Sequence, residues 1–193
     1  MRELNNRLRK GESLLWESAP KNFTMLEGKL YIKIIGQWII TVIFAIWLFY
    51  VERNRPEFGT GMKALVVAVA AAIILAPFVE YYNLKRQKYY LTDQRAMVRT
   101  ADQTWYYMDY DKIDECCVIR DMTKGVCIAM GSVILGDVRR QLRWQACHPK
   151  MDQQETSVRG EAQGIVLYQP EGAEKMIKIM QENGVKIDEN FCA

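Results

Sequence analysis

The chain is poor in the residue types from which catalytic and metal sites are usually built. It has a single histidine, His148, among 193 residues, and its five cysteines form no Cys-x-x-Cys pair. Zinc sites usually need paired ligands at short spacing, and disulfide scaffolds need many cysteines in a short secreted chain. Phosphate-loop, nucleophile-elbow and dinucleotide-binding signatures are also missing from the sequence. We therefore expect a non-enzymatic protein with reduced thiols, no catalytic residues, no metal site and no cofactor.

A strong charge of one sign is also missing. The formal net charge is only +3. A nucleic-acid-binding domain would usually carry more basic residues, clustered on one face. Nucleic acid is therefore not an expected partner.

Charged residues are absent altogether from two long segments, residues 34–51 and 64–79. The eighteen residues of the first segment would span about 27 Å as a helix, close to the hydrocarbon thickness of a bilayer. The alternative is a pair of buried helices in a soluble domain, but such helices normally keep a polar stripe, and these segments have almost none. With their apolar flanks, the segments predict transmembrane helices at residues 30–51 and 64–82.

The orientation of this helical pair follows from the positive charges beside it. The two outer flanks carry eight lysines and arginines, whereas the connecting loop, residues 52–63, carries three. Because cytoplasmic flanks are enriched in positive charge, we expect both termini in the cytoplasm and an extracytoplasmic loop. Residues 1–29 contain no early apolar core, so they read as a cytoplasmic N-terminal segment rather than as a signal peptide.

Residues 83–193 change to short extended segments divided by turns. The aromatic run at 105–110 has strong strand propensity, and the close spacing of the turns favours antiparallel hairpins. Residues 170–182 then place four apolar residues on one helical face. The predicted class is a membrane α-helical hairpin plus an α+β domain, with a polar insertion at 136–163 that reads as a long loop or an inserted hairpin.

Several segments, in this order, resemble one protein family. They are GESLLW at 11–16 with Ala-Pro at 19–20, YLTDQRAMV at 90–98, DYDKI at 109–113, and the last strand and helix at 165–180. The chain resembles the bacterial pleckstrin-homology (PH-like) membrane proteins. The resemblance implies an antiparallel PH-like β-barrel or sandwich capped by a C-terminal helix, held at the plasma membrane of a bacterium. The polar insertion departs from the short hairpin usual in that family.

Two basic clusters are candidate binding residues. Lys85, Arg86 and Lys88 follow the second apolar segment and could attract anionic lipid headgroups, although the same charges would also serve to set the topology. In the insertion, Arg139, Arg140, Arg143 and Trp144 form a candidate surface for a protein partner, with headgroups as the alternative.

Candidate catalytic residues and the aromatic run are weaker indications of function. Asp109, Asp111 and Cys147 are the main candidates for an enzyme acting on a membrane substrate, but a solvated strand edge is the favoured explanation of the two carboxylates. In the run at 105–110, strand alternation places Trp105 and Tyr107 on one face and Tyr106 and Tyr110 on the other. We expect one of these faces to be core and the other to lie on the membrane or a partner.

These observations favour a membrane-anchored scaffold or interaction module at the cytoplasmic face. It would sit in the lipid bilayer and assemble either copies of itself or another membrane protein. The juxtamembrane basic cluster supports an alternative, a module that senses anionic lipid.

Overall fold

The computed structural model describes residues 4, 6–53, 60–120, 123–131, 142–149 and 160–188. The chain divides into two compact units. One unit, Thr24–Tyr81, is helical, and the other combines Met1–Phe23 with Tyr82–Ala193. We call the second one the sheet unit.

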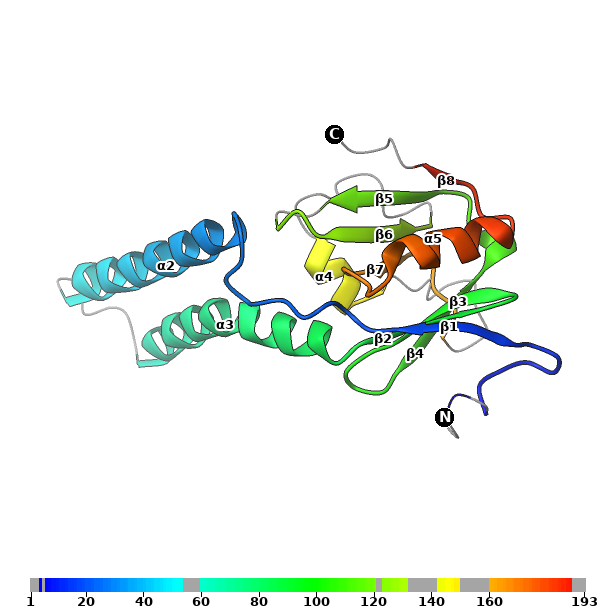
Figure 1. Cartoon of the computed structure of the whole chain (residues 1–193). Coiled ribbons are helices and arrows are strands. Elements are labelled where there is room, and N and C mark those ends of the chain that lie inside the picture. Colours follow the sequence, from blue (N-terminus) through cyan, green and yellow to red (C-terminus); the bar gives the residue numbers. More distant parts are fainter. Residues whose placement is uncertain are drawn as a thin grey trace. The chain divides into compact units, whose positions relative to one another are not determined.

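The helical unit contains α2, Leu30–Arg53, and α3, which runs from Thr60 to Lys85 (Figure 1). Both are long and apolar enough to cross a membrane, and almost none of either apolar segment is buried. The two helices run side by side and antiparallel, and Trp38 stacks on Phe78 with ring centroids 5.8 Å apart. The predicted helical pair is therefore present, and each helix extends beyond its predicted bounds.

The first sheet of the sheet unit has the order β1-β2-β3-β4, with every neighbouring pair antiparallel. Its strands are β1, Leu14–Ser18; β2, Lys88–Thr92; β3, Arg95–Arg99; and β4, Trp105–Asp109. β1 and β2 are neighbours in the sheet although the whole helical unit separates them in sequence. The segment before the helices, predicted only as a cytoplasmic N-terminal segment, thus supplies one strand of the sheet unit.

The second sheet has the order β7-β6-β5-β8. Its strands are β5, Cys116–Arg120; β6, Val126–Met130; β7, Ile165–Leu167; and β8, Ile187–Asp188. β8 pairs with β5 in the parallel direction, and the other pairs are antiparallel. In the described part of the chain neither sheet closes on itself, so the architecture is an open α+β arrangement.

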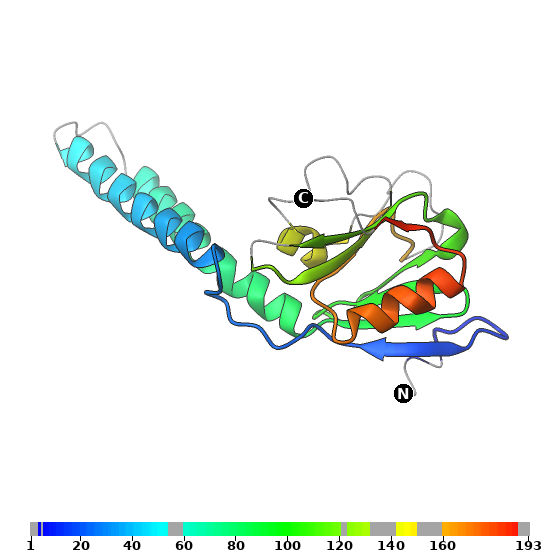
Figure 2. The same cartoon turned by 45° about the horizontal axis from the view of Figure 1, so that its top comes forward.

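The main core lies between the two sheets and beneath α5, Ala173–Glu182 (Figure 2). Met176 and Met180 of α5 are fully buried among apolar side chains from both sheets. They belong to the helical face predicted from the sequence. The helix begins at Ala173, later than the predicted start at residue 170, because Gly172 has a positive φ of 71° and lies outside it.

The polar insertion contains a short helix, α4, Leu142–Cys147. A loop or hairpin was expected there. Leu142, Ala146 and Cys147 are buried, so tertiary packing rather than local propensity accounts for this helix. Residues 136–141 and 150–159 of the insertion lie outside the described part of the chain.

Candidate functional site

An ion pair buried in the first sheet joins the N-terminal segment to β3. Arg95 donates from Nε and Nη2 to the two carboxylate oxygens of Glu12, at 2.8 and 2.9 Å. The side chains are only 6% and 0% exposed. The same carboxylate accepts from the Thr92 hydroxyl at 2.8 Å and from the Arg9 amide at 2.6 Å, and Arg95 also donates to the Arg7 carbonyl.

Burial alone would raise the pKa of Glu12, because it disfavours the charged carboxylate. The hydrogen bonds from Arg95, the Arg9 amide and Thr92 outweigh this effect, so the pKa of Glu12 lies below its usual value. The pair is therefore charged at neutral pH. Glu12, Thr92 and Arg95 all belong to the segments that carry the family resemblance, and here their role is structural.

The aromatic face of β4 beside this pair is covered from within the chain. Trp105 and Tyr107 pack with Tyr90 and Met97 of the neighbouring strands. Leu4 and Leu8 of the N-terminal segment lie in the same cluster. The opposite face carries Tyr106 and Tyr110, which pack against the main core. The predicted division of the aromatic run into two faces is confirmed. The face with Trp105 and Tyr107, expected to lie on the membrane or a partner, instead packs against Leu4 and Leu8 of the protein's own N-terminal segment.

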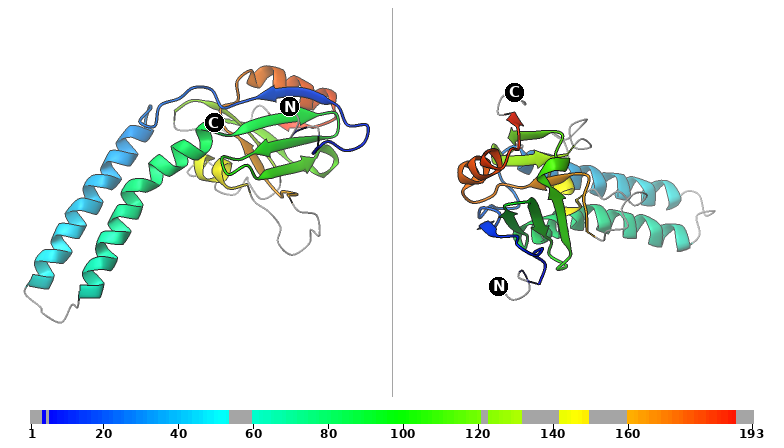
Figure 3. Two further views of the ribbon diagram at one scale, coloured as in Figure 1. Left: turned by 90° about the horizontal axis from the view of Figure 1, so that it is seen from below. Right: turned by 90° about the vertical axis from the view of Figure 1, so that its right-hand side faces the viewer.

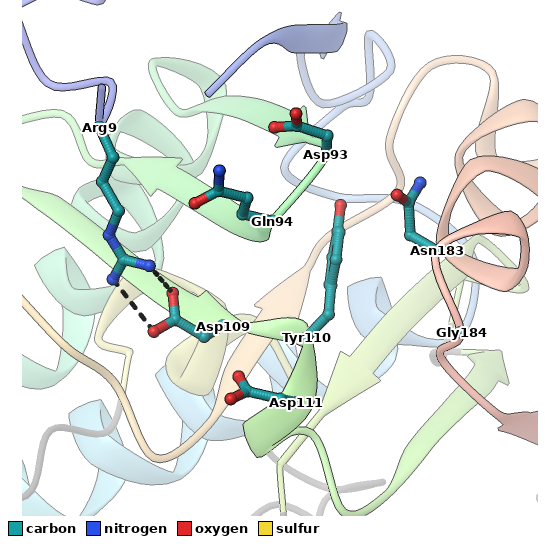
Figure 4. Close-up of a pocket in the computed structure, with 8 residues that line it drawn as sticks. All are labelled: Arg9, Asp93, Gln94, Asp109, Tyr110, Asp111, Asn183 and Gly184. Atoms are coloured by element: carbon teal, nitrogen blue, oxygen red, sulfur yellow. Dashed lines mark hydrogen bonds and ion pairs between the residues drawn. The ribbon is translucent and has the colours of Figure 1, made fainter. Parts of the chain in front are cut away.

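A polar pocket of about 460 Å³ opens next to this region (Figure 4). Its lining residues are Arg9, Asp93, Gln94, Asp109, Tyr110, Asp111, Asn183 and Gly184. Arg9 forms an ion pair with Asp109 at 3.0 Å. Asp93 accepts from the Ser13 amide, and the Tyr110 hydroxyl donates to the Thr92 carbonyl at 2.9 Å. Most of the polar groups in the pocket thus serve to hold loops and strand ends in place.

The candidate reactive groups do not form one constellation. Asp109 and Asp111 line the pocket, whereas Cys147 is buried in α4 and does not. Burial raises the pKa of the Cys116 thiol to about 12, which leaves it protonated and a weak nucleophile. In the described residues, no group of three or more histidines, cysteines or carboxylates is placed to hold a metal ion.

A second polar network begins where the chain leaves α3. Gln87, two residues after the helix ends, is 1% exposed and donates from Nε2 to the Ala146 carbonyl of α4 at 2.5 Å. The Tyr89 hydroxyl donates to Gln87 Oε1 at 3.0 Å and accepts from the Tyr168 amide at 3.1 Å. The start of β2 is thereby bound to α4 and to the residue that follows β7.

The network extends to the segment that leads into α2. Arg143 of α4 donates from Nε to the Tyr168 hydroxyl at 2.7 Å, and its guanidinium lies 5.3 Å from the Phe23 ring centroid. Phe23 in turn meets the Tyr168 ring edge-on, with centroids 5.5 Å apart. α4 therefore contacts both chain segments that connect the sheet unit to the helical unit. The sequence analysis did not identify this network. Its one local signal was the presence of two hydrogen-bonding side chains, Gln87 and Tyr89, beside the basic cluster.

The three predicted headgroup residues differ in their surroundings. Lys85 and Arg86 are exposed at the end of α3, and the Arg86 guanidinium lies 4.3 Å from the Tyr82 ring centroid. Lys88 is also exposed, but it forms an ion pair with Glu17 at 3.0 Å. The hydrogen bond to Glu17 raises the pKa of Lys88, so the lysine remains charged but is largely neutralised by its partner. Lys85 and Arg86 are therefore better candidates than Lys88 for binding a lipid headgroup.

The predicted partner surface is divided as well. Arg139 and Arg140 lie outside the described residues. Arg143 is 7% exposed and packs inside the sheet unit, so its burial takes it away from any partner. Trp144 is 60% exposed, and its ring lies 4.4 Å from that of His148. Of these four residues, Trp144 is the one that the structure places at the surface.

Comparison with known proteins gives no match to a family, to a curated protein or to a solved structure. The resemblance to bacterial PH-like membrane proteins accordingly stays a prediction from the motif residues. The geometry of the two networks, and the helical unit inserted between β1 and β2, carry the functional argument.

Proposed function

We propose that this protein is a non-enzymatic, membrane-anchored interaction module of the PH-like kind. It crosses the plasma membrane of a bacterium twice, keeps both termini in the cytoplasm, and assembles further copies of itself or a membrane protein partner. The observation that carries the proposal is the insertion of two exposed apolar helices between two adjacent strands of one sheet.

This insertion matters because it ties the sheet unit to the membrane helices at two places, before α2 and after α3. A single flexible tether would leave a domain free to tumble away from the bilayer. Two connections, each with a residue bound to α4, tether the unit to the membrane helices at two points and suit a module that positions partners at the membrane.

The outer edge of β1 offers a surface for such a partner. β1 is an edge strand, and its Leu14 and Leu15 are both exposed. An unpaired sheet edge can accept another extended segment through main-chain hydrogen bonds. The charged Glu17 and the irregular register between Leu14 and Trp16 limit indiscriminate pairing at this edge.

Crosslinking in native membranes followed by native mass spectrometry of detergent extracts tests the proposal. We expect a stable oligomer or a stoichiometric complex with a membrane protein. Replacing Leu14 and Leu15 by serine should weaken that assembly, whereas the same change at the exposed Val79 of α3 should leave it intact. A strictly monomeric wild-type species with no partner would rule out the assembly role.

A second candidate function, recognition of anionic lipid, is favoured by the exposed Lys85 and Arg86 directly after α3. Each basic residue near an anionic surface contributes about 1 kcal/mol of attraction, and salt screens it. A variant in which residues 24–81 are replaced by a flexible linker should then float with phosphatidylglycerol vesicles and be released by salt. Equal binding to neutral vesicles would eliminate this candidate.

A further inference from the structure

The short helix α4 buries most of its side chains but presents one large aromatic to the outside. Leu142, Arg143, Ala146 and Cys147 are buried, whereas Trp144 is 60% exposed. A tryptophan combines a large apolar ring with an N–H donor, so an exposed one favours an interface that is apolar on one side and polar on the other. Its place in the sheet unit indicates what covers it.

α4 is fastened to the chain directly after the membrane helix. The hydrogen bond from Gln87 reaches the Ala146 carbonyl, two residues from Trp144. Figure 3 shows α4, in yellow, beside the start of β2. Since α3 ends at Lys85, α4 is bound to the chain two residues beyond the end of that helix.

α4 is also fastened to the chain that leads into the first membrane helix. Arg143 packs over Phe23, seven residues before α2 begins at Leu30. Two independent contacts, through Arg143 and through the Ala146 carbonyl, thus bind α4 to the chain segments that precede and follow the helical unit. Trp144 is carried by the same turn.

The length of α3 beyond its charge-free run sets how far the last residue of this helix lies from the hydrocarbon. The charge-free run ends at Val79, and the six residues from there to Lys85 rise by about 9 Å in a helix. The headgroup zone of one leaflet is about 5–8 Å deep, so the end of α3 lies at its outer margin. The exposed Tyr82, with the Arg86 guanidinium over its ring, is typical of that zone.

We infer that the Trp144 indole inserts into the headgroup region of the bilayer, so that α4 makes a third membrane contact for the sheet unit. This inference rests on the proposed crossing of the membrane by α2 and α3. Tryptophan suits the site because its ring prefers the interface while its N–H stays within reach of lipid carbonyls and water. A protein partner would need a wider apolar patch, and the exposed ring beside Trp144, directly after this helix, belongs to the polar His148.

Fluorescence quenching by brominated lipid tests the insertion in the full-length protein. The chain is reconstituted in nanodiscs of phosphatidylcholine with bromine atoms near the carbonyl end of one acyl chain. Subtracting the emission of Trp144→Phe from that of the wild type isolates Trp144. We expect bromine to reduce this emission at least twofold, and aqueous acrylamide to quench it several times less than it quenches free tryptophan.

Two other tryptophans provide matched controls. Trp47 lies within α2 and is exposed along its length, so the emission isolated with Trp47→Phe must be quenched by the bromines. Trp105 stacks on Tyr90 inside the sheet unit at 5.2 Å, so the emission isolated with Trp105→Phe must not be. Because Trp144 is exposed, its replacement by phenylalanine should leave the fold unchanged, which near-ultraviolet circular dichroism checks.

The outcomes separate the two proposals. Quenching of Trp47 without quenching of Trp144, and ready access of acrylamide to Trp144, would overturn the insertion while leaving the membrane anchor in place. Protection of Trp144 from both quenchers would also overturn it, because a protein surface would then cover the ring. Failure of the bromines to quench Trp47 would refute the membrane crossing itself.

Discussion

Glu12 and Arg95 show how single residues hold the two chain segments of the sheet unit together. Their side chains are almost fully buried, and they are 83 positions apart in the sequence. A buried pair adds little net stability against apolar replacements of the same shape, but it is costly to break on one side. The pair therefore serves to fix where the N-terminal segment lies, and it should be sensitive to loss of either partner.

Replacing Glu12 by glutamine should destabilise the sheet unit by about 3 kcal/mol, because the Arg95 guanidinium would stay buried without a counter-ion. The matched control is Glu17→Gln, which removes the exposed ion pair with Lys88 and should cost well under 1 kcal/mol. Urea unfolding of the full chain in detergent, followed by circular dichroism, measures both. Equal effects of the two changes would contradict the structural role of the buried pair.

The lowered pKa of Glu12 also predicts how stability depends on pH. A carboxylate with a folded-state pKa below its unfolded value stabilises the fold above the unfolded pKa, about 4.3 for glutamate. That stabilisation is lost as the pH falls through the folded-state pKa. The wild type should therefore lose stability below about pH 4.5 more steeply than Glu12→Gln. Asp102, whose pKa is lowered by the hydroxyls of Thr100 and Thr104, adds an effect of the same sign in both proteins. Parallel pH profiles of the two proteins would contradict this prediction.

Among the elements, α4 depends most on contacts outside itself. Six residues are too few for a helix that is stable alone. We therefore expect the hydrogen bond from Gln87 to contribute measurably to the stability of α4. In Gln87→Ala, amide exchange in residues 142–147 should become about tenfold faster, which corresponds to a lost hydrogen bond of about 1.4 kcal/mol. The exposed Gln94→Ala is the control. Hydrogen-exchange mass spectrometry that shows no difference between these variants would mean that α4 is held by packing alone.

The elements also show what a sequence can specify by itself. α2 and α3 were predictable because length and uniform hydropathy belong to the segments themselves. The two faces of β4 were predictable because strand alternation is local. The cover over Trp105 and Tyr107 was not, because Leu4 and Leu8 reach it across about a hundred residues of chain, and no local pattern records that contact.

The same reasoning applies to the candidate site. Lys85 and Arg86 were identified by position alone, and the structure leaves both exposed. Arg143 was identified by its charge, but a charge in a polar insertion does not reveal that Phe23 and Tyr168 will bury it. Gln87 was overlooked because its role depends on a carbonyl in α4. Position and hydropathy thus predict the apolar helices and the exposed basic residues beside them, whereas buried polar pairs need the fold.

On the scale of the whole molecule, the sheet unit is built from two chain segments that flank the helical unit. The later segment alone lacks β1, which covers one edge of β2, and it lacks Glu12, the counter-ion of Arg95. The domain is therefore not the contiguous stretch of residues 83–193. A fragment that begins at residue 82 would bury an uncompensated guanidinium and expose the aromatic face of β4.

Two deletions of opposite kind test this construction. Removing residues 1–23 should leave the chain with a sheet unit that fails to show a cooperative unfolding transition, because the lost strand and the lost carboxylate each destabilise it by several kcal/mol. Replacing residues 24–81 by a Gly/Ser linker of about 30 residues, which spans about 30 Å on average, should instead give a folded, water-soluble sheet unit. Hydrogen exchange in β2 and β3 provides the readout, with slow exchange expected only in the linker variant. Slow exchange in the chain without residues 1–23 would show that the second segment folds on its own and that β1 is an accessory to the sheet.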